Sequence, residues 1–214
     1  MKKIIFVDFD ETLINLNFFN SLILFYANYP LNLIRILSIV IVVAFIPLWI
    51  LLYAFNNNLL IKLLSYILFK DINYDTANNI FRNSVKENLI KNINKEVLKI
   101  LEGKIVFIIS GSIEEILKPV CDHYGFYYVG TVMEKKNGKF TGKILKLNTY
   151  QNKNLAIQKI LEKYKDKEVK TYGIGNSYND FAMLKNLDEI FLVNPNSKLI
   201  TELKKYNKKY KILH

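Results

Sequence analysis

Four short apolar runs, each ending in a cluster of polar residues, constrain the fold of this chain more than any other feature. The runs cover residues 4–7, 104–109, 168–174 and 190–193. Continuous apolar stretches of this length are typical of parallel strands that are buried on both faces of a sheet. Helical stretches lie between them or after them, at residues 113–124, 153–164, 180–187 and 198–206. Strands alternating with helices predict an α/β fold with a doubly wound, Rossmann-like parallel sheet.

A long segment between the first two runs does not continue this alternation. Residues 16–99 are helical in character, and an amphipathic pattern over Asn73–Leu101 predicts a helix with one buried face. We therefore expect residues 1–15 and 100–214 to form a catalytic core and residues 16–99 to form an inserted, all-helical cap. Within the core, the Asn-Gly pair in residues 129–146 predicts a β-hairpin.

The cap contains an unusually apolar segment, residues 36–55, which has twenty residues without a charge. This length is sufficient to span a membrane, but one crossing would separate Asp8 from the later polar clusters. Three interpretations remain open: a hairpin broken near Pro47 on the membrane surface, a second crossing by residues 59–69, or apolar helices buried in a soluble cap or dimer. We favour the surface hairpin, which predicts peripheral or re-entrant association with the inner face of the cell membrane.

Charge and cysteine content bear on the partners and the compartment. The formal net charge of +11 reflects either a lysine-rich solvated surface or attraction to an anionic partner. No nucleic-acid-binding motif is recognisable, so we expect no nucleic acid and favour anionic lipid as the charged partner. The single cysteine, Cys121, cannot form an internal disulfide, which predicts a reducing, cytoplasmic compartment.

The first run ends in Asp8-Phe9-Asp10-Glu11-Thr12, which places two carboxylates two residues apart at a strand end. Both can reach one site there, because ligands of open α/β sheets bind beyond the carboxyl ends of the strands. Asp8 is a candidate nucleophile and Asp10 a candidate general acid and base. The alternative is a strand-end turn with solvated acids.

The second run ends at Ser110, followed by Gly111. A hydroxyl and a closely approaching backbone N–H suit a phosphoryl oxygen, although Ser-Gly-Ser is also an ordinary loop sequence. Lys153 opens a predicted helix, and its ammonium could neutralise a phosphoryl group. Lys146 is the competing candidate for this role in a lysine-rich chain.

The third run is followed by Gly175-Asn176-Ser177-Tyr178-Asn179-Asp180. Asp180 is the candidate direct ligand of Mg²⁺, a cation that prefers oxygen ligands, and Asn176 could contribute its amide oxygen directly or through water. No single cluster is decisive. Their joint order, each after a strand or at the start of a helix, predicts that they converge.

Together these motifs resemble the haloacid dehalogenase-like superfamily, in the phosphoserine-phosphatase-like branch that carries a helical cap after its first motif (subfamily IB). The stretch Asp8-Phe9-Asp10-Glu11-Thr12-Leu13 resembles the first motif, Ser110-Gly111-Ser112 the second, Lys153 the third, and Gly175 to Asp180 the fourth. The resemblance extends over nearly the whole chain.

This resemblance implies that Asp8 becomes an aspartyl phosphate and that Asp10 is the general acid and base. It implies Mg²⁺ as cofactor, held by Asp8, the carbonyl of Asp10 and Asp180. Asn176 stands where the family usually has aspartate, which removes one negative charge near the metal. We expect weaker metal binding from this change, without loss of catalysis.

The same resemblance assigns Ser110, Gly111 and Lys153 to binding of the phosphoryl group, and we include Thr12 with them. Glu11 stands where glycine is usual, which we expect the fold to tolerate. The apolar insertion is similar, by its length and position, to that of the phosphatidylglycerophosphatase C family.

The main hypothesis is a magnesium-dependent phosphomonoesterase for a lipid-linked phosphate such as phosphatidylglycerophosphate. The first alternative is a phosphatase of a small soluble metabolite such as phosphoserine. The second is a non-catalytic module that binds a membrane or a partner.

Overall fold

One sheet forms the centre of the computed structural model, which describes residues 1–30 and 32–213 and, of residues 34, 35, 46, 49–58 and 151, the backbone alone. Within this part of the chain seven strands have the spatial order β4-β3-β2-β1-β5-β6-β7. Every neighbouring pair is parallel except β3 and β4. The strands are β1 (Lys2–Val7), β2 (Ile105–Ile113), β3 (Tyr127–Lys136), β4 (Lys139–Lys146), β5 (Val169–Gly175), β6 (Glu189–Val193) and β7 (Lys211–Leu213). The predicted α/β fold with a mostly parallel sheet is confirmed.

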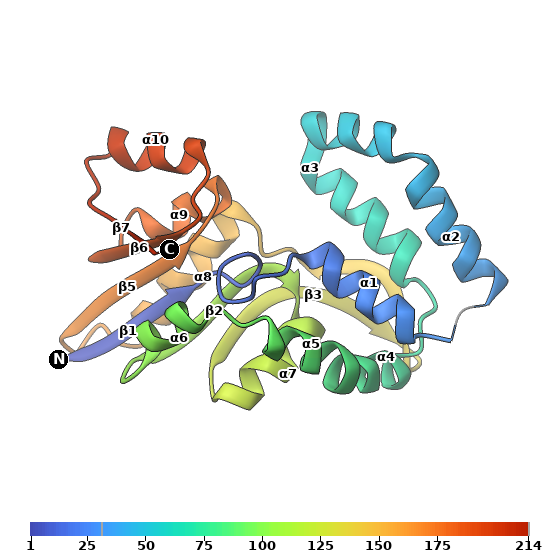
Figure 1. The fold of residues 1–214 in the computed structure, drawn as a ribbon, viewed down its shortest axis with the longest axis horizontal. Coiled ribbons are helices and arrows are strands. Elements are labelled where there is room, and N and C mark those ends of the chain that lie inside the picture. The colour runs from blue at the N-terminus through green and yellow to red at the C-terminus, as the bar shows by residue number, and fades with distance from the viewer. Residues whose placement is uncertain (31, 214) are drawn as a thin grey trace.

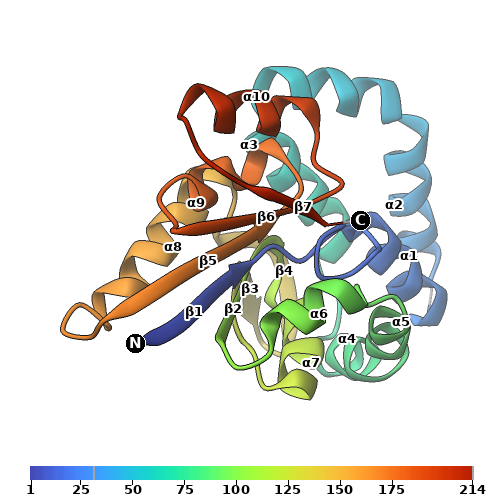
Figure 2. The same cartoon turned by 60° about the vertical axis from the view of Figure 1, so that its left-hand side comes forward.

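Strand β1 lies between β2 and β5 at the centre of the sheet, and its last four side chains are fully buried. Successive side chains of a strand point to opposite faces. Accordingly, Ile5 and Val7 pack into one apolar cluster, whereas Ile4 and Phe6 pack into another. Helices cover both faces (Figures 1 and 2). They are α7 (Glu114–Tyr124) on one side, and α8 (Tyr150–Glu162), α9 (Phe181–Leu184) and α10 (Ser197–Lys205) on the other.

Two features of the sheet differ from the prediction. Strand β2 does not end at Ser110 but continues to Ile113, with a register shift between Ile109 and Ile113 where it pairs with β3. Such an irregularity re-aims side chains beside a site. Strand β7 was not predicted, because three residues at the edge of a sheet carry little hydrophobic pattern.

The predicted hairpin is present as β3 and β4. Its turn has positive φ at both Asn137 (51°) and Gly138 (72°), as the tight turn favoured by Asn-Gly requires. Strand β4 approaches α3 (Ile46–Phe69) so closely at Gly142 that an added Cβ would lie 2.8 Å from the Cα of Tyr66. The hairpin thus connects the sheet to the inserted segment.

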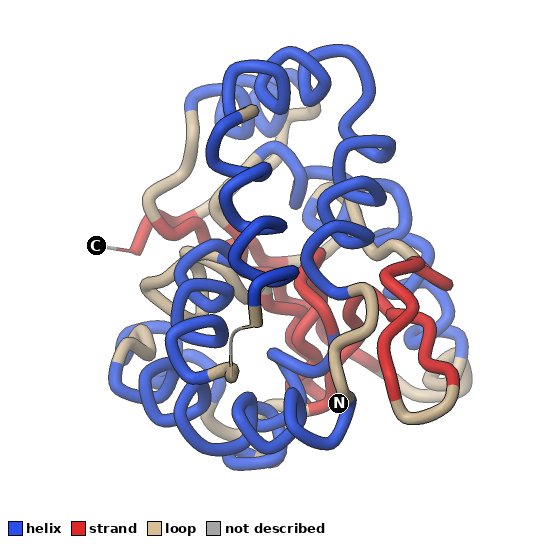
Figure 3. Tube along the Cα trace, turned by 90° about the vertical axis from the view of Figure 1, so that its right-hand side faces the viewer, coloured by secondary structure: helices blue, strands red, loops and turns tan. Residues whose placement is uncertain are grey.

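The inserted segment is helical (Figure 3, blue). Besides α3 it contains α1 (Phe18–Asn28), α2 (Leu33–Ala44), α4 (Tyr74–Ile80), a π-helical turn (Phe81–Val85), α5 (Lys86–Lys91) and α6 (Lys95–Leu101). The buried face predicted for residues 73–101 is confirmed, since its apolar residues are all buried (Ile80, Val85, Leu89, Ile93, Val97 and Leu101), but the stretch is not a single helix. The chain breaks between α5 and α6, where the Asn94 side chain accepts hydrogen bonds from the backbone N–H groups of Glu96 and Val97.

Helices α2 and α3 form an antiparallel pair, of which α2 lies away from the sheet (Figure 1), whereas the end of α3 packs against β4. The chain turns at Phe45, and Pro47 lies in the first turn of α3. Backbone N–H groups in the first turn have no hydrogen-bond partner within the helix, so the N–H that proline lacks is not needed there. This agrees with the predicted break near Pro47. Among the described residues, no helix is long and apolar enough to cross a membrane.

Candidate active site

The predicted site residues meet at the carboxyl ends of the central strands. Asp8 follows β1, Ser110 lies near the end of β2, Asp180 follows β5, and Lys153 lies in the first turn of α8. Asp8, Ser110 and Lys153 border a cavity of about 870 Å³ between the sheet and the cap, whereas Asp180 does not line it and lies buried behind Lys153. Predicted residues that line it are Asp8, Asp10, Ser110, Gly111, Lys153 and Asn176.

Lys153 joins the first and last of these motifs. Its Nζ lies 2.6 Å from Asp8 Oδ1 and 2.7 Å from Asp180 Oδ1, although the three residues are far apart in sequence. All three side chains are buried: the residues are 6% (Asp8), 0% (Asp180) and 4% (Lys153) exposed. Two buried carboxylates are therefore held beside each other by one ammonium, which offsets the cost of their burial.

Burial raises the pKa of the Asp8 carboxyl to about 7, and the negative charge of Asp180 adds to this effect, while Lys153 acts against it. For Lys153, burial acts to lower the pKa, but the attraction of Asp180 and Asp8 is stronger and the pKa is raised. Lys153 therefore stays cationic. With two carboxylates and one ammonium, this part of the site carries a net negative charge, so a second cation beside Asp8 would be favoured.

Asp10 points to the end of β2. Its Oδ2 accepts hydrogen bonds from Ser112 Oγ at 2.5 Å and Ser110 Oγ at 3.3 Å. Burial raises the pKa of Asp10 to about 6, although these two hydrogen bonds lower it. A carboxyl with such a pKa can both give and take a proton near neutral pH.

Asp180 is held by the loop that follows β5. Its Oδ2 accepts hydrogen bonds from the backbone N–H of Asn176 and of Ser177 and from Ser177 Oγ, at 3.0–3.2 Å. Its other oxygen faces Lys153. The carboxylate is thus fixed with one oxygen toward the site.

Thr12 is fully buried, and its hydroxyl donates to Asp8 Oδ2 at 3.2 Å. It does not line the cavity. This position suits orientation of Asp8 better than the predicted contact with phosphate. Lys146, the alternative to Lys153, is exposed on β4 and is not among the lining residues.

Two further buried residues support this end of the sheet and were missed from sequence. The Asn148 side chain donates to the carbonyls of Ser110 (2.9 Å) and Val129 (3.0 Å), and the Thr131 hydroxyl donates to the Gly111 carbonyl at 2.7 Å. They fix the backbone of Ser110 and Gly111. Isolated Asn and Thr residues in a chain rich in Asn carry no motif that could have identified them.

The oxygen-rich set around Asp8 and Asp180 fits Mg²⁺ by ligand type. Among the described residues, no group of three or more His, Cys, Asp or Glu side chains is arranged to hold a metal. The Asp10 carboxylate accepts hydrogen bonds from the two serines, so it is not directed toward Asp8 and Asp180 as a third carboxylate ligand. The residues present therefore fit a site with two carboxylate ligands.

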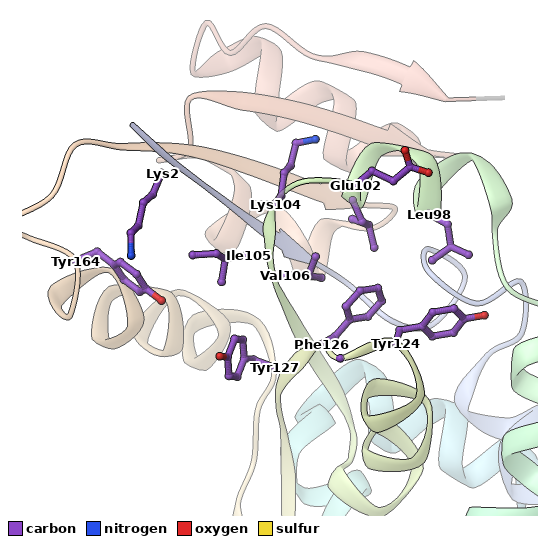
Figure 4. Close-up of a pocket in the computed structure, with 12 residues that line it drawn as sticks. Lys2, Leu98, Glu102, Lys104, Ile105, Val106, Tyr124, Phe126, Tyr127 and Tyr164 are labelled. Carbon is purple, nitrogen blue, oxygen red and sulfur yellow. The ribbon is translucent and has the colours of Figure 1, made fainter.

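A second cavity, of about 630 Å³, lies at the opposite end of the sheet, where β1 and β2 begin (Figure 4). It is bordered by aromatic residues such as Tyr124, Phe126 and Tyr164 and by the cations Lys2 and Lys104. None of the predicted site residues lines it, and it lacks a pair of acids. It has no part in the chemistry described above.

Comparisons with known proteins agree with this geometry. The model of the haloacid dehalogenase-like hydrolase family matches residues 5–185, and the chain belongs to this family. The predicted superfamily is thereby confirmed, together with the predicted class of enzyme, a hydrolase of the haloacid dehalogenase-like phosphatase type. A comparison with curated proteins found no match.

Solved structures share the fold over nearly the whole chain. A protein of unknown function from Bordetella pertussis Tohama I has 13% identity and a TM-score of 0.73, with 99% of this chain and 98% of that chain covered. A phospho-aspartyl intermediate analogue of phosphoserine phosphatase has 20% identity and a TM-score of 0.63, with coverages of 99% and 93%. A hydrolase of the haloacid dehalogenase-like (HAD) family from Salmonella enterica subsp. enterica serovar Typhi has 16% identity and a TM-score of 0.69, with 94% of this chain and 65% of that chain covered. These likenesses support the phosphoserine-phosphatase-like fold.

Proposed function

We propose that the protein is a magnesium-dependent phosphomonoesterase that acts through an aspartyl phosphate on Asp8. The observation that carries this proposal is that Lys153 forms ion pairs with both Asp8 and Asp180 at the carboxyl ends of the parallel strands. It gathers a nucleophile, a fixed cation and a second carboxylate in one place. Such a set suits transfer of a doubly charged group.

In the first step a carboxylate oxygen of Asp8 attacks phosphorus, and the bond from phosphorus to the alcohol oxygen breaks. Asp10 gives its proton to that oxygen as the alcohol leaves. In the second step Asp10 takes a proton from water, whose oxygen attacks phosphorus. The bond to Asp8 breaks and inorganic phosphate is released.

The other residues bind and orient. Lys153 and the Ser110-Gly111 segment would contact the phosphoryl oxygens, and Thr12 would hold Asp8. Mg²⁺, held by Asp8, Asp180 and the Asp10 carbonyl with Asn176 nearby, would neutralise charge on the phosphoryl group. We propose that this enzyme has two units, a cap formed by residues 16–99 and the core that flanks it.

The substrate has two candidate classes. A small soluble ester such as phosphoserine is supported by the fold shared with phosphoserine phosphatase. A lipid-linked phosphate such as phosphatidylglycerophosphate finds no support in the comparisons. The observation in its favour is that α2 and α3 expose apolar side chains, among them Leu37 (51%), Val40 (54%) and Val43 (60%). The same side chains support the proposed contact with the inner face of the membrane.

The test of the activity is phosphate release from simple monoesters by the purified chain with Mg²⁺ and with EDTA. Asp8→Asn is expected to lower release by a thousandfold or more, roughly the effect of removing a nucleophile. Asp122→Asn is the matched control, because Asp122 lies on the surface in an ion pair with Lys118. A phosphorylated Asp8 peptide should appear by mass spectrometry after acid quenching. Full activity of Asp8→Asn would contradict the proposal.

A further inference from the structure

The cavity above Asp8 is built from two chemically different parts. Its floor comes from the sheet, the loops that follow the strands and the start of α8, and is polar and charged, whereas the part contributed by the cap is mostly apolar. The cap contributes Phe18, Phe19 and Leu22 from α1 and Leu60, Ile61, Leu64, Leu68 and Phe69 from α3, with Asn17 and Ser65 as its polar residues. Leu60, Leu64 and Leu68 recur at helical spacing, so one face of α3 forms a continuous apolar wall.

The charged groups available to a ligand are few. Among the described lining residues the ionisable acids and bases are Asp8, Asp10, Glu11 and Lys153, besides the phenol of Tyr150, and all belong to the core. Lys153 already contacts two carboxylates. A carboxylate on the alcohol part of a substrate would therefore enter without a cation to pair with it, which is costly in a partly desolvated site. An ammonium could reach Glu11, which is exposed.

We infer that the site selects monophosphates of neutral, apolar alcohols, with the phosphoryl group on Asp8 and the carbon chain against Leu64 and its neighbours on α3. This inference rests on the proposed phosphatase activity and names the substrate class of the same site. The volume of about 870 Å³ accommodates a ligand well beyond a phosphoryl group with three carbons. Phosphoserine, which carries a carboxylate, is the wrong kind of ligand for this wall.

The experiment measures kcat/KM for phosphate release by the full chain with Mg²⁺. Soluble substrates are propyl, butyl and hexyl phosphate, O-phosphoserine and phosphoethanolamine. Phosphatidic acid in detergent micelles forms a separate arm, which distinguishes a lipid source of the apolar chain from a soluble one. We expect kcat/KM to rise by about two- to fourfold with each methylene that is buried, and phosphoserine to be the poorer substrate.

A matched pair of variants locates the selectivity. Leu64→Ser should lower kcat/KM for hexyl phosphate by about tenfold and leave propyl phosphate little changed, because only the longer chain reaches this residue. Leu63→Ser is the control: Leu63 is adjacent on α3, is 38% exposed and does not line the cavity. If Leu64→Ser does not fold, as judged by circular dichroism, Ile61→Ser replaces it.

The outcomes separate the two proposals. Equal or better turnover of phosphoserine, or no dependence on chain length, would overturn the inference while leaving the phosphatase activity intact. No release from any ester would instead refute the proposed activity. In that case binding of hexyl phosphate and phosphoserine to Asp8→Asn, measured by calorimetry, still tests the apolar wall, and tighter binding of phosphoserine would reject it.

Discussion

The floor and the wall of the active-site cavity obey different constraints. On the floor, the carboxylates proposed for the chemistry are held by second groups, Asp8 by Thr12 and Lys153, and Asp180 by the loop after β5. The wall is made mostly of apolar side chains, which form few directed bonds. A floor of this kind fixes a reaction, whereas a wall of this kind determines which alcohol can leave.

The same contrast holds for the two units as a whole. Apolar side chains of the central strand are fully buried, whereas many on α2 and α3 remain exposed. The end of α3 is anchored by the buried ring of Phe69, whose centroid lies 6.3 Å from that of Phe25 on α1 and 5.9 Å from that of Phe140 on β4. The cap is therefore attached firmly at its base, and its outer helices contribute little to the stability of the monomer.

The largest effect is expected from removal of the floor's cation. Lys153→Ala leaves two buried carboxylates without a counterion, so phosphate release should fall by about a thousandfold and the free energy of unfolding by about 3–5 kcal/mol. Lys146→Ala is the control, since Lys146 is exposed, and should change stability by less than about 0.5 kcal/mol. Urea unfolding and phosphate release measure both. Equal losses in the two variants would break the distinction between the bridging lysine and a surface lysine.

Next comes a direct comparison of core and cap leucines. Leu117→Ala on α7 removes a fully buried side chain and should lower the free energy of unfolding by about 2–5 kcal/mol. Leu37→Ala on α2 removes one that is 51% exposed and should cost less than about 0.5 kcal/mol. Urea unfolding at a low protein concentration measures both. A large loss for Leu37→Ala would show that α2 is covered by something in solution, such as a second copy of the chain.

The difference between floor and wall also explains what could be predicted from sequence. Asp8, Ser110 and Asp180 each follow or end an apolar run, and the carboxyl ends of parallel strands share one edge of a sheet, so their convergence follows from topology. Lys153 could be preferred to Lys146 only by its place at the start of a helix, and the structure supplies the reason in its two ion pairs.

The residues that support the site and the composition of its apolar wall could not be predicted from the sequence. Asn148 supports the site through hydrogen bonds to backbone carbonyls, which leave no trace in the spacing of side chains. The composition of the wall depends on which face of α3 turns toward Asp8, and residues 59–69 are apolar on more than one face. Hydrophobicity alone therefore left residues 59–69 open as a second membrane crossing, whereas in the structure Leu60, Leu64 and Leu68 line the cavity.

A smaller effect tests the contact that joins the two units. Gly138→Ala and Gly142→Ala both place a side chain at positive φ, which costs about 1–2 kcal/mol. At Gly138 no atom lies within 4 Å of the added Cβ, but at Gly142 the backbone of Tyr66 on α3 lies 2.8 Å away. Gly142→Ala should therefore cost about 1–3 kcal/mol more than Gly138→Ala. It should also speed proteolysis within α2 and α3. Equal costs would mean that β4 does not support the cap.

The smallest expected effect concerns Asp8 on the floor, where a substitution is expected to raise the stability of the fold instead of lowering it. The pKa of Asp8 is about 7 in the fold, against 3.8 for the free side chain, so its ionisation is less favourable in the folded chain than in the unfolded one. A raised acid pKa means that stability is lost as pH rises from about 4 to 7. Without Mg²⁺, Asp8→Asn should therefore raise Tm by a few degrees at pH 8 and by less at pH 5. Thermal unfolding in EDTA at the two pH values measures this, with Asp122→Asn as the surface control. A lower Tm for Asp8→Asn at pH 8 would show that the attraction between Lys153 and Asp8 exceeds the cost of burying the carboxylate.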